Sequence, residues 1–408
     1  MKNSMRIYSL LILILFQTVA FGQTPEPKQS VTLLFVGDVM GHEPQIRSAF
    51  DEKTQTYNYH DVFAGVSSLF NLADITIANL EVTLGGEPYT GYPQFSSPDE
   101  LVDGVIAAGV DVFVTANNHT VDRRKAGILR TIDVLNKKGI PFAGSYADAQ
   151  QKDTTYPLML EHNGIRLALL NYTYGTNGIP VPSPTIVNLI DTAQIRADYQ
   201  KSQQLNADEV IVCIHWGNEY QRTPSVEQLK LTQFMHNLGI RLVIGSHPHV
   251  IQRMEASFDT DSTEGRVAVY SLGNFVSNQR PRYRNGGALA AINIVKENGK
   301  TRITDAAYAL VWVHTPIVNG KKLHRVLPVA QYENRSNFFN STDQELFNQF
   351  VSDSRTLLDA ENYNFPEIAI RDNQWVVPWL RSSNTPPYLK PVLPNSSSTL
   401  PNRLSMPY

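Results

Sequence analysis

The sequence is poor in cysteine. Cys213 is the single cysteine among 408 residues, which excludes an intrachain disulfide. It lies inside the apolar run V-I-V-C-I-H, where we expect it to pack as a small buried hydrophobe. A catalytic thiol is the alternative, because side chains alternate along a strand and Cys213 shares a face with His215. The apolar surroundings favour the packing role, since reactive thiols need exposure.

The chain also lacks a strong charge bias. Its 35 Lys and Arg residues face 38 Asp and Glu residues, so the formal net charge is -3. No long run of Lys or Arg occurs, and we expect no nucleic-acid partner. With 42% hydrophobic and 18% charged residues and no internal repeat, the chain can form one large globular core or two smaller ones.

The apolar stretch near the start of the chain is short. It runs from Tyr8 to Phe16, well under the roughly 20 residues that cross a bilayer. Lys2 and Arg6 precede it and a less hydrophobic segment follows as far as Gly22, a pattern typical of a secretory signal peptide over residues 1–22. We therefore expect a periplasmic or secreted protein. Membrane association through an uncleaved signal is the alternative.

From Val31 onward, short apolar runs alternate with amphipathic stretches, which predicts an α/β fold. The expected strands include Ile75–Leu80, Val110–Ala116, Ile140–Gly144, Val210–His215 and Leu242–Gly245. The expected helices are Val62–Leu72, Pro98–Ala108, Arg124–Lys138, Ala193–Leu205 and Ser225–Leu238.

Two Asn-Gly turns indicate a second sheet. His162-Asn163-Gly164 joins strands expected at Tyr156–Glu161 and Ile165–Asn171, because Asn-Gly accepts the positive φ of a tight hairpin. Later strands are expected at Arg266–Leu272, Gly287–Val295, Thr301–Ile303 and Tyr308–His314, with a turn at 297–299. Two sheets covered by helices predict a four-layer αββα sandwich.

Domain boundaries follow from composition. We predict a main domain over residues 31–320 and a C-terminal helical extension over 321–381, with a helix near Asp343–Leu358. Residues 382–408 are rich in Pro, Ser and Asn and predict an extended or disordered tail. Prolines at 180, 182 and 184 predict a loop over Thr173–Pro184 near the site.

Polar residues stand where the predicted strands end, and open α/β sheets place ligands at that edge. Carboxylate, amide and imidazole groups there would form a plausible ligand set for one or two divalent ions such as Mn, Zn or Fe. Each residue alone has a local explanation, such as a turn or a helix cap, but their order along the chain is specific. The candidate ligands are Asp38, Glu81, Asn118, His215, His247 and His249.

Other polar residues complete the candidate site. Asn79 shares the strand face of Glu81 and could orient that carboxylate or touch the ligand, or make a local turn bond. His119 follows Asn118 and could act as a general acid. Asn274 follows a strand and could contact substrate. Candidate substrate-binding residues are Glu219, Tyr220, Arg280 and Arg282, although solvent-exposed arginines are the alternative.

These motifs resemble the bacterial capsule synthesis (CapA) family, which is related in fold to calcineurin-like metallophosphoesterases. The resemblance covers about Val31 to Gln279 and depends on G-D-V-M, N-L-E, N-N-H, H-W-G-N-E-Y, S-H-P-H-V-I-Q and Y-S-L-G-N-F. It implies a metallophosphatase-like fold in which Asp38 and His249 hold one metal, Glu81 bridges two metals, and His119 donates a proton. Asn118, His215 and His247 would hold the second metal.

Two positions depart from the phosphoesterase pattern. Val39 and Met40 follow Asp38 in place of a D-x-H motif, and Glu81 replaces the usual Asp. His42 could supply the missing ligand or have another local role.

The resemblance implies an exported accessory of capsule or poly-γ-glutamate biosynthesis. We expect a metal-dependent hydrolase that acts on an amide or phosphoester bond of an anionic cell-surface polymer, with a membrane polymer synthetase complex as a further possible partner. A non-catalytic polymer-binding or export module is one alternative. A generic metallophosphodiesterase is the other.

Overall fold

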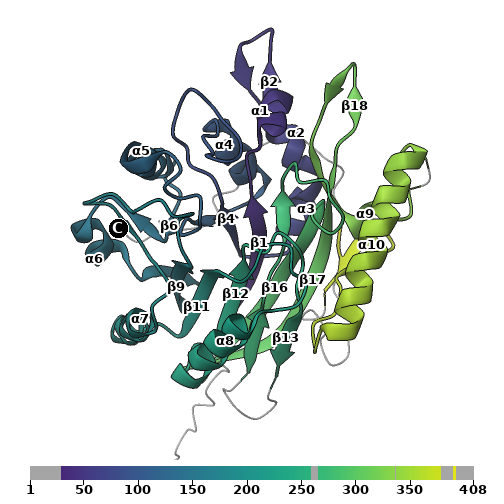
Figure 1. Cartoon of the computed structure of the whole chain (residues 1–408). Helices are drawn as coiled ribbons and strands as arrows, with labels where there is room; N and C mark the ends of the chain where they lie inside the picture. The colour runs from purple at the N-terminus through teal and green to yellow at the C-terminus, as the bar shows by residue number, and fades with distance from the viewer. Residues whose placement is uncertain (1–28, 259–264, 336, 378–388, 392–408) are drawn as a thin grey trace, which may run out of the picture.

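The computed structural model describes residues 29–258, 265–335, 337–377 and 389–391. The predicted signal peptide at 1–22 and the predicted tail at 382–408, except for 389–391, lie outside these residues. Within the described residues, no helix has the length and apolar character needed to cross a membrane. The prediction of a mixed α/β fold is confirmed, because two large sheets are accompanied by helices (Figure 1).

The first sheet is built around the long first strand. β1 pairs in parallel with β4 on one side and antiparallel with β16 on the other, and β15 also pairs with its carboxyl end. The spatial order is β20 (Arg325–Pro328), β17 (Lys300–His314), β16 (Gly286–Glu297), β1 (Gln29–Val39), β4 (Ile75–Leu80), β5 (Val112–Val114) and β6 (Phe142–Ala143), with β15 (Asn274–Val276) beside β1.

The second sheet contains the predicted Asn-Gly hairpin. Asn163 and Gly164 have φ values of 48° and 72°, as a tight hairpin turn requires. The spatial order is β13 (Met254–Ser257), β14 (Arg266–Val269), β12 (Leu242–Ser246), β11 (Glu209–His215), β9 (Ile165–Thr173) and β8 (Leu158–His162). Its central strands β9, β11, β12 and β14 are parallel, so their carboxyl ends share one edge.

The two sheets pack face to face around the main core. Leu33 and Phe35 of β1 belong to the same buried cluster as Leu167 and Leu169 of β9, whereas Leu34 faces the helices outside the first sheet. This alternation places every second side chain in the interior between the sheets. Fully burying each of these large side chains stabilises the fold by about 1.5–3 kcal/mol.

Helices cover the outer faces of both sheets and thereby complete the layers (Figure 1). Those associated with the first sheet include α2 (His60–Phe63), α3 (Ser67–Phe70), α4 (Glu100–Ala108) and α5 (Arg124–Lys137). Those associated with the second sheet include α7 (Thr192–Gln204) and α8 (Val226–Leu238). The remaining helices are α1 (Glu43–Ala49), α6 (Ala149–Thr155), α9 (Val329–Tyr332) and α10 (Ser341–Glu361).

The remaining strands form small ribbons at the periphery. They are β2 (Phe50–Asp51) with β3 (Thr56–Tyr57), β7 (Ser145–Tyr146) with β10 (Ile186–Val187), β18 (Ile317–Val318) with β19 (Lys321–Lys322), and β21 (Ala369–Arg371) with β22 (Gln374–Val376) and β23 (Leu389–Pro391). The region 321–381, expected to be a helical extension, contains α9 and α10 but also strands β20, β21 and β22.

Two predicted elements differ in the structure. The single helix expected over Val62–Leu72 is wrong: a 3-10 turn at Ala64–Val66 separates α2 from α3. A Cβ on Gly65 would lie 2.7 Å from the Val326 carbonyl oxygen, so packing against β20 shapes this segment. The two strands expected at Thr301–Ile303 and Tyr308–His314 are one continuous strand, β17.

Candidate metal centre

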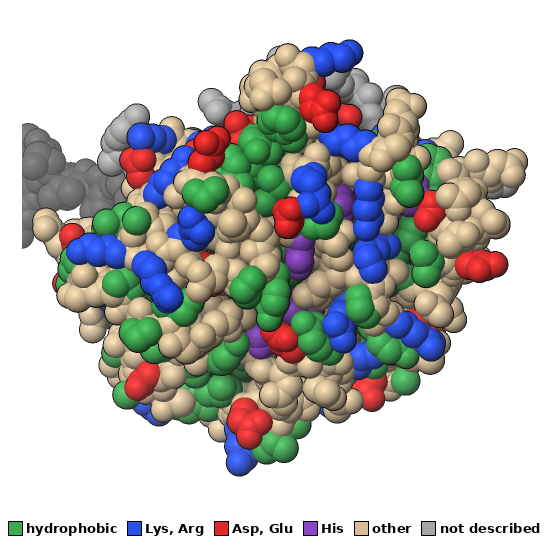
Figure 2. Space-filling view, turned by 45° about the horizontal axis from the view of Figure 1, so that its top comes forward, with side chains coloured by type: hydrophobic (Ala, Val, Ile, Leu, Met, Phe, Trp, Pro, Cys, Tyr) green, Lys and Arg blue, Asp and Glu red, His purple; other side chains and the backbone are tan. Residues whose placement is uncertain are grey.

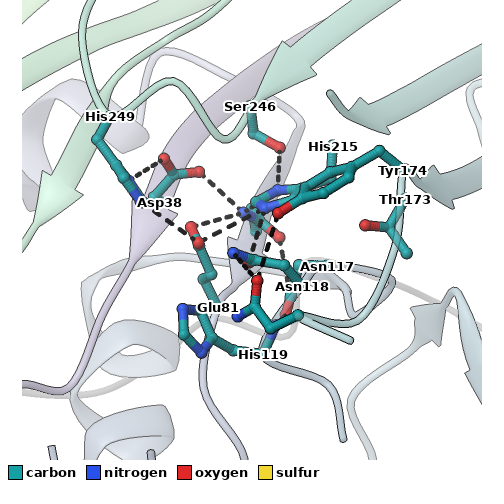
Figure 3. A network of polar contacts seen from close by, with 12 residues as sticks. Asp38, Glu81, Asn117, Asn118, His119, Thr173, Tyr174, His215, Ser246 and His249 are labelled. Carbon is teal, nitrogen blue, oxygen red and sulfur yellow. Dashed lines mark hydrogen bonds and ion pairs between the residues drawn. The ribbon is translucent and has the colours of Figure 1, made fainter. Parts of the chain in front are cut away.

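The strand ends bring the predicted ligands into one buried cluster. Asp38 at the end of β1 is aligned with Asn79 of β4 and with Asn274 of β15. His215 at the end of β11 is aligned with Ser246 of the neighbouring strand β12, and both lie in the second sheet. Figure 3 shows the side chains of both sheets directed toward one another. The cluster therefore forms because parallel strands of two sheets end at the same place.

The two carboxylates of the cluster are fully buried. Asn79 bridges them, with its Nδ2 donating to Asp38 Oδ1 at 2.8 Å and to Glu81 Oε2 at 3.5 Å. Burial and the neighbouring charge of Asp38 raise the pKa of Glu81 well above its usual value. Glu81 Oε1 has no hydrogen-bond partner among the described residues. A buried carboxylate oxygen without a hydrogen-bond partner is costly, and its position is compatible with a bound cation.

His249 faces both carboxylates. Its Nδ1 lies 3.1 Å from Asp38 Oδ2 and 3.1 Å from Asn274 Oδ1, so this nitrogen carries a proton and donates. The Nε2 lone pair is then free and lies 3.7 Å from Glu81 Oε1. A histidine fixed in this way through one ring nitrogen presents the other to a metal.

His215 reaches the cluster from the second sheet. Its Nδ1 lies 3.0 Å from Ser246 Oγ, and its Nε2 lies 3.0 Å from Asn118 Oδ1 and 3.5 Å from Glu81 Oε1. Burial, and then the nearby histidines, lower the pKa of His215 well below its usual value. His215 is therefore neutral, as a metal ligand must be.

The loop after β12 holds two histidines in uncommon backbone conformations. His247 and His249 have φ values of 100° and 57°, in the left-handed region that non-glycine residues rarely adopt. Burial lowers the pKa of His247 to about 3, and its Nδ1 has no hydrogen-bond partner among the described residues. Such strain is concentrated at functional sites, where it holds a side chain in a required position.

The donor set fits a divalent cation. Ligand atoms of Glu81, His247 and His249 lie within 4.8 Å of one another, and so do those of Asp38, Glu81 and His215. Glu81 belongs to both groups, and its Oε1 and the Nδ1 of His247 have no hydrogen-bond partner among the described residues. Imidazole and carboxylate donors suit Zn, Mn and Fe.

His119 is held by an acidic partner beside the cluster. Its Nδ1 lies 2.7 Å from Asp122 Oδ2, and its ring lies edge-on to Phe95 at 4.6 Å between centroids. Asp122 also accepts from the Phe95 backbone N–H at 2.8 Å. Because Asp122 binds Nδ1, it fixes the tautomer of His119 and leaves Nε2 to exchange a proton with a ligand.

Of the predicted substrate-binding residues, Tyr220 packs beside the cluster, whereas Arg280 and Arg282 bind groups outside it. Tyr220 is 37% exposed, and its ring centroid lies 6.1 Å from that of His249. Burial and the charge of the exposed Glu219 raise the pKa of Tyr220 to about 12. Arg282 binds both oxygens of Asp353 at 2.6 and 2.7 Å. Arg280 donates to the Val313 carbonyl oxygen at 2.9 Å.

Asn274 has a positioning role in the structure. Its Nδ2 donates to the carbonyl oxygens of His249 and Arg284 at 3.4 and 2.8 Å and to Gln279 Oε1 at 3.2 Å. Together with the contact between its Oδ1 and His249, these bonds fix the imidazole that faces Glu81.

Sequence reasoning missed two residues that complete the site. Tyr174 lies in the proline-rich loop predicted near the site, and its ring packs against His247 at 4.6 Å between centroids. In the same loop Asn177 Oδ1 accepts from Asn118 Nδ2 at 3.3 Å. The prolines identified the loop, but no local pattern identified these residues. His42, considered as a ligand, instead caps α1 together with Gln45.

A family model for bacterial capsule synthesis protein PGA_cap matches residues 32–279, more than half of the chain. The chain belongs to this family. The matched range contains the whole histidine and carboxylate cluster, which confirms the resemblance found in the motifs.

Curated relatives carry related names. The chain is 30% identical over 291 residues to the capsule biosynthesis protein CapA of Bacillus anthracis, covering 68% of this chain and 66% of that protein. It is 26% identical over 309 residues to the PGA biosynthesis protein CapA of Bacillus subtilis, covering 72% of this chain and 76% of that protein. The chain thus spans about two thirds of the Bacillus anthracis protein.

Solved structures show a partial likeness. A phosphatase from Mycoplasma pneumoniae is 16% identical with a TM-score of 0.43, covering 70% of this chain and 95% of that one. The calcineurin-like phosphoesterase YfkN from Bacillus subtilis is 13% identical with a TM-score of 0.40, covering 80% of this chain and 98% of that one. TM-scores of this size do not establish a common fold.

Proposed function

We propose that this chain is an exported accessory of capsule or poly-γ-glutamate biosynthesis, and that its buried cluster is the centre of a metal-dependent hydrolase. Membership of the capsule synthesis family supports the biological role. The observation that carries the chemical role is the pair of unpartnered atoms Glu81 Oε1 and His247 Nδ1 in a cluster of potential ligands. Buried side-chain atoms without partners also occur elsewhere among the described residues, but these two belong to the groups of side chains that could hold a metal ion.

The residues that would hold metal are the members of the two ligand groups described above. Asp38, Glu81, His215, His247 and His249 would hold it, and Glu81 is common to both ligand groups. Asn118 Oδ1 contacts His215 Nε2 and would add an amide oxygen to the His215 side. A bound divalent ion would lower the pKa of a coordinated water and polarise the carbonyl or phosphoryl oxygen of the substrate.

The remaining steps belong to the chain's own side chains. His119 would protonate the leaving group through Nε2, because Asp122 occupies Nδ1 and holds the ring in place. Asn79 Nδ2 donates to both Asp38 and Glu81 and so holds the two carboxyl groups beside each other. Tyr174 would cover the substrate above His247 and limit access of solvent. The bond cleaved would be an amide or a phosphoester of the anionic polymer.

The location follows from the proposed role. Handling of a cell-surface polymer requires export, which the predicted signal at 1–22 would provide. A membrane polymer synthetase complex would then be the natural partner.

Turnover measurements test the hydrolase. The metal-loaded chain is assayed on poly-γ-glutamate and on a generic phosphodiester, beside His119→Asn. We expect hydrolysis by the original chain, a loss of about 10²–10⁴-fold in kcat in the variant, and an unchanged metal content. Polymer binding without turnover of either substrate would replace the hydrolase with a binding or export module. Turnover of the phosphodiester alone would indicate a generic phosphodiesterase.

A further inference from the structure

A group of basic side chains lies beside the metal centre, on loops that the proposed chemistry does not use. We call it the distal cation cluster and define it as Asn278, Arg280, Lys322 and His324. Asn278 Oδ1 accepts from Lys322 Nζ at 3.0 Å and from His324 Nε2 at 3.1 Å. Figure 2 shows Lys and Arg side chains gathered beside the histidines at the centre of this face.

The distal cation cluster is connected to the metal centre by a short segment. Asn274, which binds His249, and Arg280 are six residues apart, so their Cα atoms lie at most about 20 Å apart. A second connection passes through His42, whose Nδ1 accepts from the Asn278 backbone N–H at 3.3 Å. The His42 ring contacts Phe95 at 5.3 Å, and Phe95 contacts His119. An extended chain bound at the metal centre would therefore reach the cluster.

The positive charge of the cluster is only partly balanced. Among the described residues, no carboxylate forms an ion pair with Arg280 or Lys322, and Asp343 is the acidic group that influences Arg280. Asp343 is itself bound to His314 and Asn340. Burial lowers the pKa of Arg280 to about 10, and burial together with Lys322 and Arg280 lowers the pKa of His324 to about 3. With His324 neutral, Arg280 and Lys322 contribute two positive charges against the one nearby charge of Asp343, which suits an anionic ligand.

The cluster also offers a free acceptor. His324 is 2% exposed, and because its Nε2 donates to Asn278, its Nδ1 is a lone-pair acceptor. This Nδ1 has no hydrogen-bond partner among the described residues. An N–H donor on the ligand would satisfy it. A site that combines a carboxylate partner with an N–H partner matches an amide-linked polyanion better than a phosphate chain, which has no N–H groups.

From this geometry we infer that Arg280, Lys322 and His324 form a second subsite, which binds a carboxylate-bearing, amide-linked unit of the polymer several units away from the bond at the metal centre. The inference rests on the proposed polymer substrate and names the part of the chain that recognises its charge. Arg280 and Lys322 bind the carboxylate, and His324 Nδ1 accepts from the adjacent amide. The subsite would hold the polymer in register over the metal centre.

Binding of a defined oligo-γ-glutamate to the full chain tests this subsite, measured by calorimetry in chelator so that no turnover occurs. We expect Lys322→Gln and Arg280→Gln each to weaken binding about tenfold, as loss of a charged hydrogen bond predicts. Lys322→Arg should retain affinity. The matched control is Lys321→Gln, the exposed neighbour on the same ribbon, whose Nζ binds the Phe50 carbonyl oxygen; it should stay within about twofold of the original.

The outcomes separate this subsite from the hydrolase. A tenfold loss in Lys322→Gln together with no turnover by the metal-loaded chain would retain the subsite and reject the hydrolase. Equal affinities for Lys322→Gln and Lys321→Gln would overturn the subsite, as would the absence of measurable binding by the original chain. Tighter binding of a polyphosphate of equal charge would overturn the assignment to a carboxylate polymer. If Arg280→Gln does not fold, the Lys322 pair of variants decides the matter alone.

Discussion

The two ends of strand β11 each carry a buried ionisable group, Glu209 at the start and His215 at the end. The two groups differ in whether their surroundings satisfy them. At the start of the strand, Glu209 is paired with Arg241 and also contacts Thr301 Oγ1 at 3.4 Å. At the end of the strand, His215 faces Glu81, whose Oε1 has no hydrogen-bond partner among the described residues. Both regions are buried, but only the first is complete within the protein.

This difference separates a polar group that is satisfied within the protein from one that is not. Burial raises the pKa of Glu209, but Arg241 opposes the shift and supplies the matching charge. The nearest charge to Glu81 is another carboxylate, Asp38, which raises the Glu81 pKa further. Holding like charges together in a dry site destabilises the metal-free protein and favours the binding of a cation. The two ends should therefore respond in opposite ways to removal of a charge.

Arg241→Ala should produce the largest effect. It leaves Glu209 buried without its cation, and breaking a buried pair costs about 3–5 kcal/mol of the free energy of unfolding. Denaturant unfolding measures the loss, and replacing both partners by apolar residues should recover much of it. A loss below about 1 kcal/mol, the range of exposed pairs, would show that the pair is not the complete structural unit described.

Glu81→Gln should instead increase the free energy of unfolding of the metal-free chain. Removing the charge relieves burial and repulsion from Asp38, and we expect a gain of about 1–3 kcal/mol in chelator. Because the folded pKa of Glu81 is raised, its stabilising contribution is complete below pH 4.5 and is lost as pH rises. The advantage of the variant should therefore grow as the pH rises above 4.5, measured by unfolding at several pH values.

Added metal provides the check on this variant. Mn or Zn should stabilise the original chain and have less effect on Glu81→Gln, since ligands that bind the folded state raise stability. If Glu81→Gln destabilised the metal-free chain by as much as Arg241→Ala does, that result would contradict the contrast between the two ends of β11.

His236 in the last turn of α8 gives the smallest expected effect. Burial lowers its pKa to about 4, and its Nε2 has no hydrogen-bond partner in the described parts of the chain, but it belongs to neither ligand group. A lowered histidine pKa contributes stability that is present above pH 6.5 and is lost as pH falls toward 4. His236→Gln should reduce the loss of unfolding free energy between pH 7 and pH 5 by about 1 kcal/mol. An unchanged pH slope would exclude His236 as a buried neutral group.

The metal centre was predictable because its residues follow strand ends. Parallel strands carry their terminal residues to one edge, so Asp38, Glu81 and His215 could be grouped without knowledge of the contacts. The Asn163-Gly164 turn likewise determined a hairpin from local chemistry. These features depend on short-range patterns that a sequence displays directly.

The remaining features depend on contacts between distant segments. The helix expected at Val62–Leu72 is interrupted where Gly65 meets β20, which lies far along the chain. Tyr174 contacts His247 through a loop without regular periodicity, and Lys322 reaches Asn278 from a separate ribbon. Tertiary packing decides such positions, and it overrides the local preference of the sequence.

Bound metal per protomer, measured by elemental analysis after loading with Mn or Zn, tests the buried cluster most directly. The comparison uses the original chain, His247→Ala combined with His249→Ala, and His236→Ala as a half-buried histidine outside both ligand groups. We expect metal in the original chain and in His236→Ala, and its loss from the double variant. Equal metal content in all three proteins, or no metal in the original chain after loading, would contradict the assignment of this cluster as a metal centre.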